Sequence, residues 1–182
     1  ITKDAQFELF DYKYSKCKGI RSYNPLPTIS NSSIDNAVEL INNAKNPFIV
    51  WGQGVILGNA EKEFKDFVEK SGIPAAWTIL GLSALPTSHE LNVGMVGMHG
   101  NYGPNILTNK CDLLIAIGMR FDDRVTGDPK SYASQAKIIH LDIDPAEINK
   151  NIKVDVPVIG DCKESLKLIT NKIQKKSYDK WI

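Results

Sequence analysis

The sequence predicts an α/β fold, a doubly wound domain whose mostly parallel central sheet is flanked by helices. Three observations support this fold class. Apolar runs of strand length alternate with segments of helical periodicity, which is the order expected of strands joined by helical crossovers. The apolar runs are continuous, as in parallel strands buried on both faces. Each run ends in or is followed by glycine, aspartate, arginine or threonine, as at the ligand-binding edge of a Rossmann-like sheet.

The first part of the chain differs from the rest. Residues 1–31 mix aromatic and charged residues without a clear period and end in the Pro-rich stretch NPLPT, which we interpret as an extended linker. A helix is expected at residues 32–44, where Ser32 and Asp35 form a capping-box pattern before an apolar stripe.

The alternation then continues to the end of the chain. Strands are expected at residues 47–51, 73–79, 112–118, 137–144 and 156–160. A glycine-rich turn is expected at residues 52–58 and a long irregular stretch at residues 81–105. Helices are expected at residues 59–72, ending at Gly72, and at residues 162–176, where Asp161 and Glu164 form a capping box.

Composition excludes several classes of protein. The 182 residues are 42% hydrophobic and 24% charged with a formal net charge of +1, so there is no excess of lysine and arginine for nucleic-acid binding. No apolar run approaches the roughly 20 residues that span a membrane. Three scattered cysteines argue against a disulfide framework or a zinc site, and we expect reduced thiols in a cytosol-like compartment.

The residues that follow the predicted strands suggest a nucleotide site. Glycines allow close backbone approach to phosphate, arginine offers a planar fork for an anion, and an acid at a strand end can accept ribose hydroxyls. Each feature also has a structural interpretation, which stays open: a tight turn for GQGVILG, a loop held by surface ion pairs for RFDDR, helix capping for Asp142 and Asp161, and a hydrogen-bonded structural role for His99.

Catalytic motifs do not occur in the sequence. There is no P-loop, no HExxH and no recognisable nucleophile with histidine and aspartate partners. We therefore expect a binding domain without catalytic machinery of its own.

The motifs GMRFDDRVTG, KIIHLDIDPAEINKN, GLSALP, VGMVGMHG and VPVIGDCKESL together resemble the middle domain of the catalytic subunit of acetohydroxyacid synthase (acetolactate synthase). This transferase family depends on thiamine diphosphate. The resemblance implies that residues 1–20 are the tail of a preceding pyrimidine-binding domain, with ITKDAQF as its last strand. Residues 21–176 would be the middle, FAD-binding domain, and residues 177–182 the start of a linker to a C-terminal pyrophosphate-binding domain.

The resemblance also implies an activity for the parent enzyme. The family decarboxylates pyruvate and joins the two-carbon fragment to pyruvate or 2-ketobutyrate, at the start of branched-chain amino acid biosynthesis. FAD is required there without net redox change. Thiamine diphosphate and Mg²⁺ sit between the other two domains. Because the GDG…N motif for thiamine and Mg²⁺ and the catalytic glutamate of the N-terminal domain do not occur here, we expect the chain alone to be inactive.

Matched position by position, the resemblance implies cofactor contacts in five regions. They are Gly52, Gln53 and Gly54; Thr78, Ile79 and Leu80; Val96, Gly97, Met98 and His99 along the flavin; Gly118, Met119, Arg120, Asp122, Arg124 and Val125 at the pyrophosphate and ribityl; and Asp142, Ile143, Gly160, Asp161 and Cys162 at the adenosine end. Met98 and Asp123 match positions that face the substrate channel. No catalytic residue and no metal ligand is implied in this chain.

Some positions depart from the family pattern. Trp77 and Met119 are bulkier than the usual residues, so we expect them to reduce FAD affinity. Ser83 replaces a usual glycine, and Gly103 with Pro104 disfavours a helix where the family has a small, Ala-rich helical start.

Two rival functions compete with this interpretation. One is a structural or interaction middle domain of another thiamine-diphosphate-dependent decarboxylase that has lost its nucleotide. The other is an NAD-consuming deacylase of sirtuin-like fold, which would need paired CxxC motifs that the three scattered cysteines cannot supply. For the leading interpretation we expect a homodimer or tetramer of catalytic subunits, with or without a regulatory subunit, in the cytoplasm or in a plastid.

Overall fold

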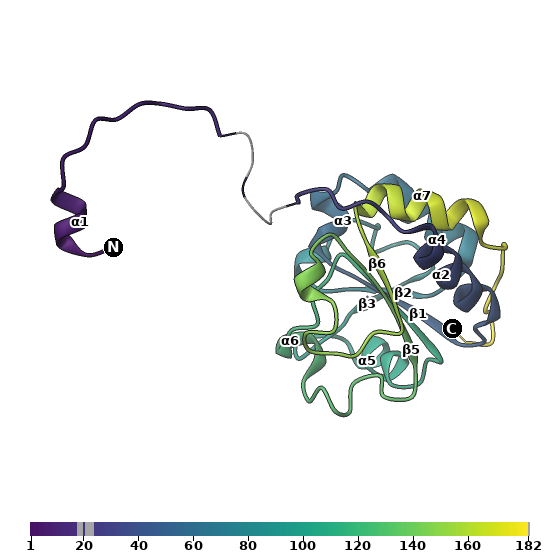
Figure 1. The fold of residues 1–182 in the computed structure, drawn as a ribbon. Helices are drawn as coiled ribbons and strands as arrows, with labels where there is room; N and C mark the ends of the chain where they lie inside the picture. The colour runs from purple at the N-terminus through teal and green to yellow at the C-terminus, as the bar shows by residue number, and fades with distance from the viewer. Residues whose placement is uncertain (18–19, 21–23, 182) are drawn as a thin grey trace.

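The computed structural model describes residues 1–17, 20 and 24–181 and contains one six-stranded, all-parallel sheet, drawn in Figure 1. The strand order is β3-β2-β1-β4-β5-β6. The strands are β1 (Pro47–Trp51), β2 (Ala75–Trp77), β3 (Asn92–Met95), β4 (Leu113–Ile117), β5 (Lys137–Asp142) and β6 (Val156–Ile159). The order reverses between β1 and β4, so the connections that follow these two strands lead to helices on opposite faces of the sheet. The predicted fold class is confirmed.

Helices cover the sheet unequally on its two faces. One face carries α2 (Asn31–Asn43), α4 (Glu61–Ser71) and α7 (Cys162–Lys172), which pack on one another (Figure 1). The other face carries the shorter α5 (Tyr102–Thr108) and α6 (Asp123–Thr126) among irregular segments. The remaining elements are α1 (Lys3–Phe7), α3 (Gln53–Leu57) and the 3₁₀ turns η1 (Ile79–Gly81) and η2 (Pro145–Glu147).

The two faces have separate hydrophobic cores because successive side chains of a strand point to opposite sides. In β1, Ile49 and Trp51 join the core under the long helices, whereas Phe48 and Val50 join the core on the other face. All five residues of β1 are buried, and so are those of β4. Burial on both faces explains why these strands are continuously apolar in sequence.

Several predicted helix ends are confirmed. Gly72 ends α4 with φ 66°, and the side chain of Asp161 caps α7 by accepting a hydrogen bond from the Glu164 amide. The predicted cap at Ser32 is wrong: α2 begins at Asn31, and Ser30 is the cap, because its hydroxyl accepts from the Ser33 amide. The capping motif therefore starts two residues earlier than the pattern suggested.

Other predictions need correction in the region between β1 and β4. The stretch at residues 81–105, expected to be irregular, contains β3 and the start of α5. Because β3 reads NVGM and is only partly buried, it lacks the apolar run that marks the other strands. Pro104 is compatible with α5 because it lies in the first helical turn, where backbone N–H groups have no intrahelical partner. The turn expected at residues 52–58 contains the short helix α3.

The two ends of the chain differ in how they relate to the rest of the domain. Residues 1–17 are exposed, and the segment expected as a strand contains the helix α1. Near the other end, the Trp181 indole N–H donates to the Pro47 carbonyl at 2.8 Å, so this segment packs against the start of β1. The predicted domain boundary falls between residues 20 and 21. Residue 21 and the final residue, 182, lie outside the described residues. Within the described part of the chain, no helix is long and apolar enough to cross a membrane.

Candidate functional site at the switch point of the sheet

Three glycines bring the loops after β1 and β4 into contact. The Gly52 amide donates to the Ile117 carbonyl at 2.9 Å, and the Gly54 amide donates to the Gly118 carbonyl at 2.8 Å. A Cβ on Gly54 would lie 2.5 Å from the Gly118 Cα, closer than real side chains approach. Gly118 itself has φ 56°, a conformation that favours glycine. Both amides therefore already donate to the protein, and the cofactor contact expected of these glycines stays a prediction.

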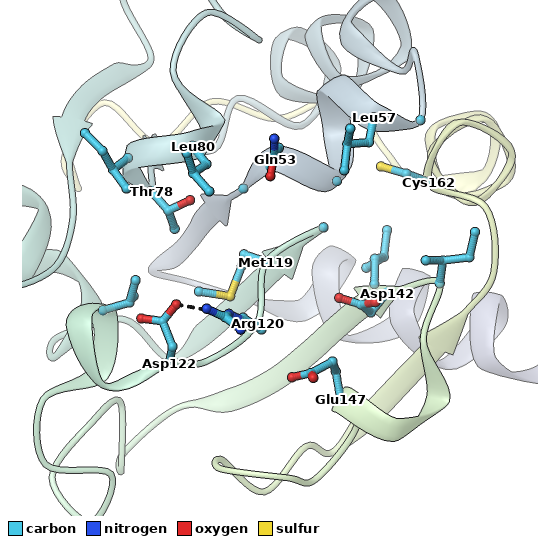
Figure 2. Close-up of a pocket in the computed structure, with 18 of the residues that line it drawn as sticks. Gln53, Leu57, Thr78, Leu80, Met119, Arg120, Asp122, Asp142, Glu147 and Cys162 are labelled. Carbon is cyan, nitrogen blue, oxygen red and sulfur yellow. Dashed lines mark hydrogen bonds and ion pairs between the residues drawn. The ribbon is translucent and has the colours of Figure 1, made fainter. Parts of the chain in front are cut away.

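A cavity of about 750 Å³ opens beside this contact (Figure 2). Its volume falls within the roughly 300–1,000 Å³ typical of ligand and cofactor sites. Most of the predicted cofactor-binding residues line it: Gly52, Gln53, Gly54, Thr78, Ile79, Leu80, Gly118, Met119, Arg120, Asp122, Arg124, Val125, Asp142, Ile143, Asp161 and Cys162. Residues from five separate loops thus converge, as parallel strands ending at one edge require.

The charged loop after β4 is organised by Asp122. One carboxylate oxygen of Asp122 accepts from the Arg120 Nε at 3.3 Å, and the other accepts from the Arg124 amide at 3.0 Å, which caps α6. The two arginine side chains remain 69% and 72% exposed, and Arg124 also pairs with Asp123. Asp122 therefore holds the loop while both guanidinium groups keep donors for a ligand.

The opposite end of the cavity is acidic. Asp142, Glu147 and Asp161 line it, after β5, in η2 and before α7. Part of their hydrogen-bonding capacity is used locally: Asp142 accepts from the Asp144 amide, and Glu147 pairs with Lys150 at 2.6 Å. Figure 2 shows Arg120 between Asp122 and Asp142 in this view. The cavity thus presents cationic donors at one end and carboxylate acceptors at the other.

Cys162 contributes a neutral thiol to the wall. Burial, followed by the nearby carboxylates of Asp161 and Asp142, raises the pKa of the Cys162 thiol to about 12. Because the thiolate is the reactive form, this cysteine is a poor nucleophile near neutral pH. It packs instead as a small apolar group close to Gly58, where a Cβ would lie 3.3 Å from that of Cys162.

Five predicted cofactor residues do not line the cavity, namely Val96, Gly97, Met98, His99 and Gly160. The first four form the turn after β3, which lies beside α6 because the Met98 amide donates to the Arg124 carbonyl at 2.8 Å. Met98 and His99 are exposed there. Asp123 lines a smaller neighbouring cavity of about 400 Å³. The flavin and substrate-channel contacts expected of these residues stay predictions.

The bulky residues expected near the site differ in their placement. Met119 lines the cavity and is 4% exposed. Trp77 does not line it; its ring packs partly buried against the core under the long helices. The position of Trp77 thus gives no support to the expected reduction of FAD affinity by this residue.

Sequence reasoning missed five residues that line the cavity: Leu26, Leu57, Gly58, Leu141 and Glu147. Glu147 follows the DIDP turn closely enough that its acid could have been grouped with Asp142. Leu26 lies in the predicted linker, where the pattern gives no sign that the chain returns to the site. Among the described residues, no group of three or more histidine, cysteine, aspartate or glutamate side chains is arranged to hold a metal ion.

A doubly wound sheet with a cavity at its switch point is the architecture of α/β domains that bind nucleotides. A model of the family described as thiamine pyrophosphate enzyme, central domain, matches residues 34–169. The chain therefore belongs to the thiamine pyrophosphate enzyme family and corresponds to its central domain.

Relatives narrow the comparison within that family. The chain is 46% identical over 166 residues to the acetolactate synthase large subunit of Corynebacterium glutamicum. The aligned region covers 91% of this chain and 26% of that protein. It is 47% identical over 173 residues to the probable acetolactate synthase large subunit of Methanococcus aeolicus, with 91% and 29% covered. It is 48% identical over 163 residues to the acetolactate synthase of Mycobacterium leprae, with 90% and 26% covered. The chain thus spans less than a third of the length of these relatives.

Proposed function

We propose that the chain is the FAD-binding central domain of an acetolactate synthase, an enzyme that condenses two pyruvates, or pyruvate and 2-ketobutyrate, with loss of CO₂ in branched-chain amino acid biosynthesis. The observation that carries the proposal is the cavity at the switch point, whose lining comes from five strand-end loops. The names of the relatives supply the activity.

The residues of the cavity fit a dinucleotide of this kind. Arg120 and Arg124 would hold the pyrophosphate and ribityl part, because their exposed guanidinium groups offer charge-assisted hydrogen bonds. Asp142 and Asp161 would accept hydroxyls of the adenosine ribose at the acidic end. The apolar wall near Leu57 and Cys162 suits an aromatic base.

The role of this chain is then binding and orientation. In the proposed reaction FAD is required without net redox change, so the protein's contribution lies in placing the cofactor. Thiamine diphosphate and Mg²⁺ would be held by other domains of the parent enzyme. We expect no acetolactate from the chain with pyruvate, thiamine diphosphate and Mg²⁺ added, and turnover by a contaminant-free preparation would overturn this assignment of domains.

The names of the relatives also suggest how the parent enzyme assembles and where it is located. Because two of them are named large subunits, we propose a regulatory small subunit as a partner, together with a dimer or tetramer of catalytic subunits. A cytoplasmic location is proposed from the same relatives.

One observation favours a second candidate, a middle domain that binds no nucleotide. The Gly52 and Gly54 amides are satisfied by the protein, and both arginines already pair with aspartates, so the site is stable without an anion. Titration calorimetry and thermal shift with FAD and with ADP separate the two. Heat and stabilisation with both ligands support the first candidate, with weaker FAD binding than in an intact enzyme. Neither effect at millimolar ligand would leave the structural domain as the function.

A further inference from the structure

Two side chains from outside the loop bind the carbonyl groups of Met119 and Phe121, the two residues that flank Arg120. The His140 ring, on β5, places its Nε2 2.8 Å from the Met119 carbonyl oxygen. The Asn151 amide nitrogen donates to the Phe121 carbonyl at 2.6 Å. The carbonyls before and after Arg120 are therefore both held, while the Arg120 side chain is 69% exposed and lines the cavity.

The alternation of side chains in the loop agrees with this grip. Met119 and Phe121 are buried, at 4% and 3% exposure, whereas Arg120 between them points outward. The Phe121 ring packs edge-on against His140 with centroids 4.9 Å apart. The backbone from residue 119 to 121 is thus anchored by side chains and carbonyls on one side, which leaves Arg120 on the other.

The polar contacts of the buried His140 ring lie on the side of the cavity. A carbonyl only accepts, so Nε2 carries the hydrogen in this contact. The other ring nitrogen, Nδ1, is buried and has no hydrogen-bond partner among the described residues. The Nε2 also lies 3.6 Å from a carboxylate oxygen of Asp142, another residue of the cavity. All polar contacts of this fully buried ring are therefore directed at the cavity wall.

We propose that His140 and Asn151 are positioning residues, which hold residues 119–121 so that Arg120 meets the negatively charged group of the ligand. This inference rests on the proposed nucleotide binding. Neither residue lines the main cavity, and Asn151 lines the smaller neighbouring cavity together with Arg120. Both residues therefore act on a ligand of the main cavity through Arg120.

The test is a double-mutant cycle with ADP as the probe. Asn151 is exposed as a residue, so Asn151→Ala should leave the fold intact. Loss of one hydrogen bond should weaken ADP binding by about 2- to 10-fold, measured by calorimetry. If Asn151 acts through Arg120, the variant Arg120→Ala/Asn151→Ala should bind no more weakly than Arg120→Ala alone. Additive losses would overturn the proposal.

Further variants separate positioning from general stability. Asn151→Leu keeps nearly the same volume but cannot donate to a carbonyl and adds no charge, so it should lose at least as much affinity as Asn151→Ala; a role in packing alone predicts a smaller loss than in Asn151→Ala. His140→Gln keeps a donor and should bind ADP better than His140→Leu. Asn92→Ala is the matched control, because the Asn92 amide also donates to two carbonyls, of Leu85 and Pro86, away from the cavity.

A ligand-free measurement completes the test. Amide hydrogen exchange should become faster at residues 118–124 in Asn151→Ala and stay unchanged in β4. If the wild type binds neither ADP nor FAD, the proposed function fails and takes this inference with it. If the wild type binds and Asn151→Ala binds equally well with unchanged exchange, only the inference is wrong.

Discussion

The loop after β1 and the loop after β4 lie against each other at the switch point, yet they use backbone and side chains differently. In the first loop, Gly52 and Gly54 carry no side chain, and their amides donate to the carbonyls of Ile117 and Gly118. In the second, Gly118 accepts that contact, and the residues after it carry two exposed arginines held by Asp122. One loop supplies close packing and the other supplies charge.

Contact with the loop after β4 explains the glycines of the turn after β1. A glycine is needed wherever backbones approach within side-chain distance, and here the approaching partner is the protein's own loop. Ligand contact would then depend on the charged side chains of the second loop. Changes in the glycines should therefore alter stability, and changes in the arginines should alter binding.

The largest effect is expected for Gly118→Ala. Its Cβ would lie 2.7 Å from the Gly54 Cα, and its φ of 56° is unfavourable for alanine. Overpacking and backbone strain together should lower the free energy of unfolding by about 2–4 kcal/mol, measured by urea denaturation. The control is Gly103→Ala in α5, where a Cβ meets nothing within 4 Å and should not destabilise. Equal stability of the two variants would contradict the packing role.

Binding should change most in Arg120→Ala. Loss of a charge-assisted contact of about 1.5–3 kcal/mol corresponds to roughly 10- to 100-fold weaker FAD or ADP binding, measured by calorimetry. The melting temperature should stay near that of the wild type, because the side chain is largely exposed. Arg120→Lys should recover only part, since an ammonium lacks the planar fork. Wild-type affinity in Arg120→Ala would leave the loop as a structural staple.

The same contrast explains what could be predicted from the sequence. The strands β1 and β4 could be predicted because burial on both faces makes them continuously apolar. The helices α4 and α7 could be predicted because one buried face gives each an amphipathic pattern. The strand β3 and the helix α5 could not be predicted in this way. The NVGM sequence of β3 is only partly buried and lacks an apolar run, and Pro104 in the first turn of α5 argues against a helix in the sequence. Of the site, the strand-end residues could be found. Glu147 could also have been found, because it lies close to Asp142 in sequence. Leu26 and the link from His140 to Met119 depend on contacts distant in sequence, which no local pattern records.

A smaller effect is expected for Asp122, which contributes both to the stability of the loop after β4 and to the position of Arg120. Asp122→Ala removes the partner of Arg120 and the cap of α6. Because exposed ion pairs contribute little, ADP affinity should fall only about 2- to 5-fold, and loss of the cap should cost about 1 kcal/mol of stability. Asp122→Asn keeps a capping oxygen without the charge. It should restore the stability but not the affinity, and restoration of both would show that the charge is unimportant.

The smallest effect is expected at Ser83, in the loop after β2, where a serine occupies a position suited to glycine. Ser83 has φ 85° and is exposed. A positive φ costs a residue with a side chain about 1–2 kcal/mol, whereas glycine adds about 0.4–1 kcal/mol of unfolded-state entropy. Ser83→Gly should therefore stabilise the protein by about 0.5–1 kcal/mol and raise the melting temperature by roughly 1–4 °C. Ser88→Gly, exposed in the same segment and not among the residues with positive φ, should not raise it. ADP affinity should be the same in both variants, because neither residue lines the cavity. A melting temperature of Ser83→Gly at or below that of the wild type would show that backbone strain does not limit stability at this edge of the sheet.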